Sequence, residues 1–526
     1  MTNQDLTQQR ALIDALRNPS VYDHPVELCE VVETHISWVI LTGEYAYKIK
    51  KAVDLGFLDF STLERRGHFC AEEIRLNGRF APHFYLERVA ITGSVQTPRL
   101  NGTGQVLEYA VKMRQFPQAQ QLDRLTEAGQ LTDALIDRLA EEVALFHGKI
   151  EAAPAGTPYG TPETVFEPVA ENFVHLDECC TTDASRQQLA ILKHWCESNH
   201  QRLRATFERR KRDGSVRECH GDLHLANMFQ WGDDVVLFDC IEFNPNLRWI
   251  DVVSDLAFVT MDLRDRGHPE YARRLLNRYL EHTGDYAGLP VLAFYKVYRA
   301  TVRAKVACIR LHQAKLSAAQ RAEAQGDVDG YLNLAHSFTE MQPPVLLITH
   351  GFSGSGKTTL TTALLERMDL IRVRSDIERK RLFGVGALER TDSATDAGIY
   401  SAGASEQTYT KLAELAALIL ESGYSALVDA TFLKRSQRER FRSLALRLGA
   451  PFLLVDFRAP AHVLRQRISQ RQEVGTDASE ATTAVLEHQL RSAEPLQHDE
   501  LEDVVVVDST RDDVSAMVLQ RLVASR

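Results

Sequence analysis

The sequence predicts an α/β protein of several domains, because its 526 residues exceed what one hydrophobic core usually serves and its apolar pattern changes along the chain. Residues 1–120 contain, from residue 28 on, short β-rich runs and one helix-like stretch. Helical periodicity dominates residues 121–340, and residues 341–526 alternate apolar strand candidates with helical stretches. We therefore expect a mixed α/β lobe, a helical lobe and a parallel sheet covered by helices, in that order.

Composition narrows the classes of function. Hydrophobic residues make up 44% and charged residues 25%, the balance of an ordinary globular protein. The formal net charge of −11 opposes non-specific attraction to polyanions, so we expect neither nucleic acid nor a membrane as a partner. No apolar run approaches the roughly 20 residues that cross a bilayer, and no signal-like segment opens the sequence, so we expect a cytoplasmic protein. The eight cysteines form no CxxC pair and are expected to be reduced thiols.

The first phosphate-handling pattern is ECHGDLHLANM, at 218–228. Asp222 and Asn227 lie five residues apart in an expected loop, which is the spacing of a kinase catalytic loop. Asp222 would accept or orient the proton of a substrate hydroxyl, and Asn227 would offer a neutral oxygen to magnesium. Asp239, at the end of the apolar strand VVLFD, is the expected second metal ligand.

A lysine and a glutamate complete this pattern. Strand alternation in AYKIKK places Lys48 and Lys50 on one face, and Lys48 fits the Ala-x-Lys pattern of a phosphate-binding lysine, with Lys50 as the alternative. In EEIRLNGRF, Glu73 shares its helical face with apolar residues three and seven positions on. Glu73 is therefore the expected ion-pair partner of the lysine, and Glu72 is the second choice.

HGDLHLAN followed by DCIEFN resembles the aminoglycoside phosphotransferase-like, or choline-kinase-like, branch of the protein-kinase fold, over about residues 28–340. The resemblance implies a bilobal fold that phosphorylates hydroxyls of small molecules with ATP, with Asp222 as base and Asn227 and Asp239 as metal ligands. The sequence departs from the pattern where Asp239 is followed by Cys-Ile-Glu, and where the turn near LTGEY has only Gly43. An inactive domain that only binds nucleotide is the alternative.

The second phosphate-handling pattern is GFSGSGKT, at 351–358, which fits G-x-x-x-x-G-K-[ST] between a strand candidate and a helical stretch. The N–H groups of such a loop and the start of the following helix attract phosphate oxygens. Lys357 would reach the β- and γ-phosphates, and Thr358 would bind magnesium. The residues expected to contact the nucleotide are Gly351, Ser353, Gly354, Ser355, Gly356, Lys357, Thr358 and Thr359.

Three further features define the expected acceptor side of this second site. Asp376 follows a strand candidate and is expected to act with Lys357 in catalysis by orienting the acceptor hydroxyl, with an N-terminal helix cap as the alternative. Asp429 ends the strand of ALVDA and suits a water-mediated magnesium contact. Arg465, Arg467 and Arg471 would clamp the transferred phosphoryl group from a lid, or form a solvated basic helix.

Residues 343–526 resemble small P-loop kinases of the zeta-toxin and gluconate-kinase kind, and the whole order resembles bacterial fusions of an aminoglycoside phosphotransferase-like domain with a P-loop kinase. The resemblance implies an α/β multidomain protein: a bilobal protein-kinase-like fold followed by a P-loop NTPase parallel sheet. It further implies two separate ATP–Mg²⁺ sites that transfer phosphoryl groups to hydroxyl acceptors. A nucleotide-sensing regulator and a toxin-like nucleotide-sugar kinase are the alternatives.

A basic helical stretch, FYKVYRATVRAKVACIRL, gives one more hypothesis. Lys296, Arg299 and Arg303 follow one helical face among small apolar residues. They would form an anion pocket beside the cleft, or else a solvated or internally paired basic face.

Overall fold

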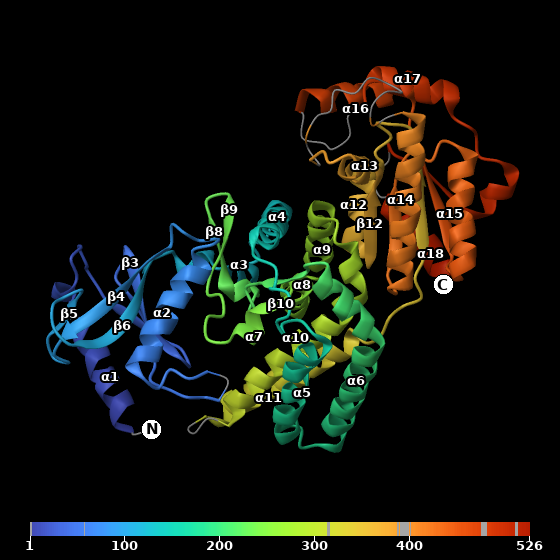
Figure 1. Cartoon of the computed structure of the whole chain (residues 1–526). Coiled ribbons are helices and arrows are strands. Elements are labelled where there is room, and N and C mark those ends of the chain that lie inside the picture. Colours follow the sequence, from blue (N-terminus) through green and yellow to red (C-terminus); the bar gives the residue numbers. More distant parts are fainter. Residues whose placement is uncertain are drawn as a thin grey trace.

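The computed structural model describes residues 3–56, 58–312, 316–386, 389, 399, 401–474, 481–510 and 514–525. The chain is mixed α/β, with a bilobal kinase-like fold followed by a five-stranded parallel sheet, as the sequence predicts (Figure 1). Within the described ranges, no helix is both long and apolar enough to cross a membrane.

The first lobe is a six-stranded antiparallel sheet in the order β1-β2-β3-β6-β4-β5. Its strands are β1 (Glu30–Glu33), β2 (Ser37–Leu41), β3 (Tyr45–Lys50), β4 (Tyr85–Gly93), β5 (Pro98–Leu100) and β6 (Val106–Arg114). Helix α2 (Leu63–Asn77) packs on one face, and Thr62 caps it by accepting a hydrogen bond from the N–H of Arg65 (3.2 Å). Helix α1 (Asn3–Ala15), which the sequence analysis did not predict, covers the other face.

The second lobe is helical and forms the largest part of the core. Its main helices are α3 (Leu122–Glu127), α4 (Asp133–Lys149), α5 (Pro162–Cys179), α6 (Asp183–Arg212), α8 (Val252–Asp265), α9 (Pro269–Thr283), α10 (Leu289–Leu311) and α11 (Ala318–Ser337). Two short antiparallel ribbons and one short helix carry the loops of the first site: β7 (Val216–Glu218) with β10 (Trp249–Asp251), β8 (Met228–Trp231) with β9 (Asp234–Leu237), and α7 (Pro245–Arg248). Helix α8 is buried on all sides, so it lies at the centre of this lobe.

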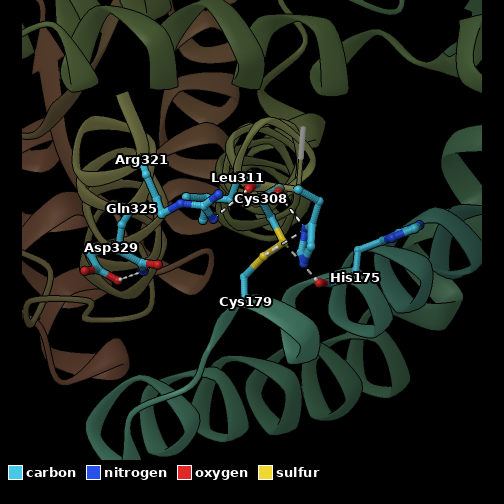
Figure 2. Close-up of a disulfide and its surroundings, with 8 residues drawn as sticks. His175, Cys179, Cys308, Leu311, Arg321, Gln325 and Asp329 are labelled. Atoms are coloured by element: carbon cyan, nitrogen blue, oxygen red, sulfur yellow. Dashed lines mark hydrogen bonds between the residues drawn. A yellow bond between two sulfur atoms is a disulfide. The ribbon is translucent and has the colours of Figure 1, made fainter. Parts of the chain in front are cut away.

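A disulfide joins Cys179 to Cys308, which corrects the expectation that all eight cysteines are reduced thiols. The two residues are 129 positions apart in sequence, but α5 and α10 pack together and bring their Cα atoms to 5.9 Å. Figure 2 shows the bond between the two helices. The Nδ1 of His312 lies 3.9 Å from the Sγ of Cys179. Sequence spacing contains no information about such a tertiary pairing.

The strands of the last part of the chain form one five-stranded parallel sheet of order β12-β13-β11-β14-β15, as expected from the alternation of apolar runs and helical stretches. They are β11 (Leu346–His350), β12 (Leu370–Arg374), β13 (Ser425–Asp429), β14 (Phe452–Arg458) and β15 (Val504–Asp508). The helices are α12 (Lys357–Arg367), α13 (Ser375–Leu382), α14 (Ala402–Glu421), α15 (Arg435–Leu448), α16 (Ala461–Val474), α17 (Thr483–Ser492) and α18 (Val514–Ser525). Alternate β11 side chains enter separate cores on the two faces, as expected for a sheet covered on both sides.

Candidate active sites

The first candidate site begins at the loop between β7 and β8, which carries the kinase-like motif. The Nδ2 of Asn227 donates to the backbone oxygen (3.0 Å) and to Oδ2 (3.1 Å) of Asp222, so the two predicted residues are in direct contact. The Nε2 of His224 lies 3.3 Å from the same Oδ2. Burial would raise the pKa of Asp222, but His224, His220 and Arg303 outweigh this effect and hold it well below its usual range. The Asp222 carboxylate is therefore ionised.

The backbone of this loop is held from below by the buried helix α8. Gly221 has φ +86°, and a Cβ at this position would lie 2.7 Å from the backbone oxygen of Leu247, so the loop requires glycine. The carboxylate of Asp255 accepts the N–H groups of His220 (2.8 Å) and Gly221 (3.0 Å). Asp255 was not predicted from the sequence. It could have been found as an acidic residue in a largely apolar helical stretch, because an unpaired charge buried there would be costly.

Hydrogen bonds connect this loop to the segment after β9. The N–H of Phe238 donates to the backbone oxygen of Asn227 (3.0 Å), and the Nε2 of His220 lies 2.8 Å from the backbone oxygen of Phe238. Asp239 follows with φ +64°, a conformation that non-glycine residues rarely adopt, and its N–H donates to the Tyr85 hydroxyl (3.0 Å). The two expected metal ligands, Asn227 and Asp239, thus lie on neighbouring backbone segments.

Two lysines of β3 meet one glutamate of α2. The Nζ of Lys48 lies 2.9 Å from Oε1 of Glu73 and also contacts Asp239, and the Nζ of Lys50 lies 2.6 Å from Oε2 of Glu73. Burial opposes ionisation of Glu73, but the two ammonium groups outweigh it and lower its pKa to about 2. Only Lys48 reaches Asp239 among these contacts, which favours Lys48 over Lys50 as the phosphate-binding lysine.

The glutamate of Cys-Ile-Glu, the run that departs from the kinase pattern after Asp239, has a defined partner. Glu242 is buried and contacts Lys50, so this residue neutralises the second lysine of β3. Glu72, the second choice for the ion pair with the phosphate-binding lysine, turns instead toward Arg75 (3.0 Å). Spacing gave no sign of the pair between Lys50 and Glu242, which are 192 residues apart.

The second candidate site is the loop between β11 and α12. The Nζ of Lys357 donates to the backbone oxygens of Gly351 (2.9 Å) and Phe352 (2.8 Å), which holds this lysine inside the loop. The Oγ1 of Thr358 donates to Oδ2 of Asp429 (2.9 Å) at the end of β13. A hydroxyl and a carboxylate, the two oxygen ligands expected for magnesium, are therefore adjacent.

A cavity of about 760 Å³ opens beside this loop, within the usual volume range of ligand pockets. Asp376 and Asp429 line it together with most of the expected nucleotide-contacting residues, namely Ser353, Gly354, Ser355, Gly356, Lys357, Thr358 and Thr359. Gly351 contributes through its backbone oxygen to Lys357 instead. The cavity therefore contains both the phosphate-binding loop and the predicted acceptor-side acid.

Asp376 is not the N-terminal cap of α13. The cap position is Arg374, no side chain makes a capping hydrogen bond there, and the helix begins at Ser375. Asp376 is the second residue of the first turn and is half-buried at the cavity wall. A negative charge in this turn also interacts favourably with the helix dipole.

The predicted lid arginines of α16 lie in different surroundings. Arg465 forms an ion pair with Glu487 of α17 (2.8 Å) and is not among the described residues that line the cavity, so its role as a phosphoryl clamp stays a prediction. Arg467 lines the cavity and donates to Oγ (3.0 Å) and the backbone oxygen (2.9 Å) of Ser509. The side chain of Arg471 lies outside the described residues. Residues two positions apart point to roughly opposite sides of a helix, so Arg467 faces the cavity while Arg465 faces α17.

The basic face of α10 does not form one anion pocket. Arg299 is buried and donates to the backbone oxygen of Gly221 (2.8 Å), Arg303 donates to the Tyr331 hydroxyl (3.3 Å), and Lys296 lies over the ring of Phe338 (5.6 Å). The three cations therefore have separate, internal surroundings, which agrees with the internally paired alternative.

Lys296 gives a testable pH dependence. Burial, with some opposition from Asp369 and added repulsion from nearby arginines, lowers its pKa to about 8. The unfolded chain therefore binds more protons between about pH 8 and 10.5, and the stability of the protein rises with pH in that window. We expect Lys296→Met to raise the free energy of unfolding at pH 7 by on the order of 2 kcal/mol.

The check is the melting temperature of Lys296→Met and of the parent protein at several pH values from 7 to above the ordinary lysine pKa. The stabilisation should shrink as pH rises, because the parent loses the cost of its buried charge. A difference that stays constant across this range would show that packing, not charge, causes the effect.

Comparison with known proteins agrees with this two-part arrangement. A model for the phosphotransferase enzyme family matches residues 70–295, and a model for an AAA domain matches residues 346–496. Uncharacterized proteins of Mycobacterium tuberculosis and Mycobacterium bovis are each 30% identical to this chain over 480 residues, which cover 90% of this chain and 93% of theirs.

Solved structures also match separate parts of the chain. An amicoumacin kinase in complex with AMP-PNP matches 63% of this chain and 96% of its own at 12% identity and a TM-score of 0.41. A gluconokinase of Sinorhizobium meliloti matches 35% of this chain and 92% of its own at 21% identity and a TM-score of 0.25. This chain belongs to the family of the mycobacterial proteins; it joins an aminoglycoside phosphotransferase-like kinase domain to a P-loop kinase domain, and it is a phosphotransferase enzyme.

Proposed function

We propose that the chain is a bifunctional phosphotransferase with two separate sites for ATP and magnesium, each of which transfers a phosphoryl group to a hydroxyl of a small molecule. The observation that supports this most strongly is that each domain brings together an acid, a lysine and oxygen-bearing side chains that could hold a metal ion. Asp222 would be the base of the first site, and Asp376 would orient the acceptor of the second.

The donor sets fit magnesium, which prefers oxygen ligands in compact arrangements. Asn227 and Asp239 would hold it in the first domain, and Thr358 and Asp429, already 2.9 Å apart, would hold it in the second. When bound, the ion supplies positive charge that offsets the negative charge of the transferred group. The lysines then bind phosphate oxygens, and each acid orients an incoming hydroxyl for in-line attack.

Two sites on one chain have a simple advantage if they act on one pathway. A product released by one domain has a higher effective concentration near the other than in bulk solution. The test is a metabolite-wide screen for ATP-dependent mass gain of one phosphate, with the parent chain, Asp222→Asn, Lys357→Ala and the double variant. Products lost in only one single variant are assigned to one domain; absence of any product with the parent chain would favour a nucleotide-sensing regulator.

Lys357→Ala is expected to weaken nucleotide binding at the P-loop site by about 10- to 100-fold, because it removes a charged contact to phosphate. The first site should be unaffected, since its lysine is Lys48 in a separate domain. Calorimetric titration of the intact chain with AMP-PNP and magnesium should show two sites in the parent and one tight site in the variant. A single site in the parent would contradict the proposal.

A further inference from the structure

A buried ion pair connects the two domains behind the P-loop. Glu281, on α9 of the kinase-like domain, accepts hydrogen bonds from Nε (2.9 Å) and Nη2 (2.7 Å) of Arg372 on β12. The two side chains are only 4% and 3% exposed. Removing two charges from water is costly, and such pairs often add little to stability.

Arg372 extends this contact to the P-loop helix. Its Nη1 donates to Oγ1 of Thr362 (2.8 Å) and lies within hydrogen-bond distance of Oγ1 of Thr361 (3.3 Å) and of the backbone oxygen of Thr358 (3.4 Å). Thr358 is the expected magnesium ligand of the second site. The guanidinium is thus held between a carboxylate of one domain and the first turns of α12 in the other.

The kinase-like domain also completes the edge of the parallel sheet. β12 is an edge strand, and such a strand leaves backbone groups without partners in the sheet. The side chain of Asn277 donates to the backbone oxygen of Leu370 (2.9 Å) and accepts the N–H of Arg372 (2.7 Å), and the Tyr286 hydroxyl donates to the backbone oxygen of Arg372 (3.1 Å). Figure 1 shows α9 next to β12 and α12, in agreement with their contacts.

The same strand leads into the acceptor side of the cavity. Arg374 lines the cavity, and its Nη1 lies 4.0 Å from Oε2 of Glu281. Asp376 follows two residues later in the first turn of α13. Burial would raise the pKa of Glu281, but Arg372, Arg374 and Arg278 outweigh it and keep the pKa below its ordinary value. An ionised carboxylate therefore faces both arginines of this strand.

We propose that Glu281, although it belongs to the kinase-like domain, is a positioning residue for the P-loop site. It holds Arg372 against α12, and Arg372 fixes the turn that carries Thr358. Glu281 acts through Arg372 and needs no contact with nucleotide. This inference rests on the proposed function of the P-loop domain as a magnesium–nucleotide site.

The test uses Glu281→Gln in the full-length chain, within a Lys48→Ala background that weakens the first nucleotide site. Calorimetry with AMP-PNP measures affinity at the P-loop site over a series of magnesium concentrations. We expect affinity to fall about tenfold or more, and the magnesium concentration for half-maximal binding to rise, because the support of Thr358 is lost. A change in magnesium dependence is not expected from a loss of stability alone.

A second variant distinguishes the positioning role from misfolding of Glu281→Gln. Arg372→Lys keeps a positive charge beside Glu281 but lacks the planar fork that reaches Thr362, so it should show the same loss of affinity and the same shift in magnesium dependence. Unchanged magnesium dependence in both variants, with the fold intact by melting temperature, would overturn the proposal.

Asp369→Asn is the matched control. Asp369 forms an ion pair with Arg273 across the same interface (2.8 Å), so its substitution removes an interdomain contact that does not involve Arg372. It should lower the melting temperature without changing nucleotide affinity. If it reduces affinity as much as Glu281→Gln, the interface acts only through stability and the positioning role is wrong. If the background chain binds no AMP-PNP at all, the proposed function of the P-loop domain fails first.

Discussion

Asp222→Asn is expected to lower phosphoryl transfer by the kinase-like domain at least about a hundredfold and to leave ATP affinity nearly unchanged. The amide cannot accept the proton of an acceptor hydroxyl. The residues proposed to bind nucleotide and metal, Lys48, Asn227 and Asp239, all remain. Because the pKa of Asp222 is held well below its usual range, protonation of this group should not reduce activity of the parent protein at mildly acidic pH.

The measurement compares turnover of an acceptor from the mass screen with ATP affinity by calorimetry. Asp234→Asn is a suitable control, because Asp234 lies in the same domain but is exposed and paired with Arg138 (2.8 Å). The control should retain full activity. Turnover retained by Asp222→Asn would refute the assignment of the base, and loss of ATP affinity would indicate a structural role for the carboxylate instead.

Short motifs and strand periodicity were sufficient to predict much of this molecule. Asp222 and Asn227 lie in one loop, so their spacing in sequence nearly determines their distance in space. The pair of Thr358 and Asp429 was predictable for another reason: both follow parallel strands of one sheet, and the carboxyl ends of such strands lie at the same edge. The first pair follows from local chain geometry, and the second from the topology of a parallel sheet.

Contacts between elements that are far apart in the sequence were not predictable in this way. Two examples are the disulfide of Cys179 with Cys308 and the ion pair of Lys50 with Glu242. Both depend on how whole elements pack, and a single sequence does not give the distances between elements. The lid arginines show a related limit on one helix: Arg465 and Arg467 both fit a basic lid, and only the rotation of α16 decides which side chain lines the cavity. Sequence patterns therefore predicted the helices and strands, but tertiary packing decides which of their side chains come into contact.

Asp376→Asn is expected to lower phosphoryl transfer to the acceptor of the P-loop domain at least about a hundredfold, while ATP affinity is preserved. Asp376 lines the cavity that also contains Lys357, and it lies at the carboxyl edge of the sheet, where ligands of such folds bind. The expected magnesium ligands, Thr358 and Asp429, already contact each other without it. Its carboxylate is thus available to orient a hydroxyl for in-line attack.

A purely structural role for Asp376 makes a different prediction. As an acid in the first turn of α13, it would contribute about 0.3–1 kcal/mol through the helix dipole, and its loss would lower stability with catalysis retained. Glu378→Gln is the matched control, because Glu378 lies in the same turn but is buried and paired with Arg381. Melting temperature, ATP affinity and acceptor phosphorylation of both variants decide between the roles. Unchanged phosphorylation by Asp376→Asn, together with a lowered melting temperature, would reject the catalytic one.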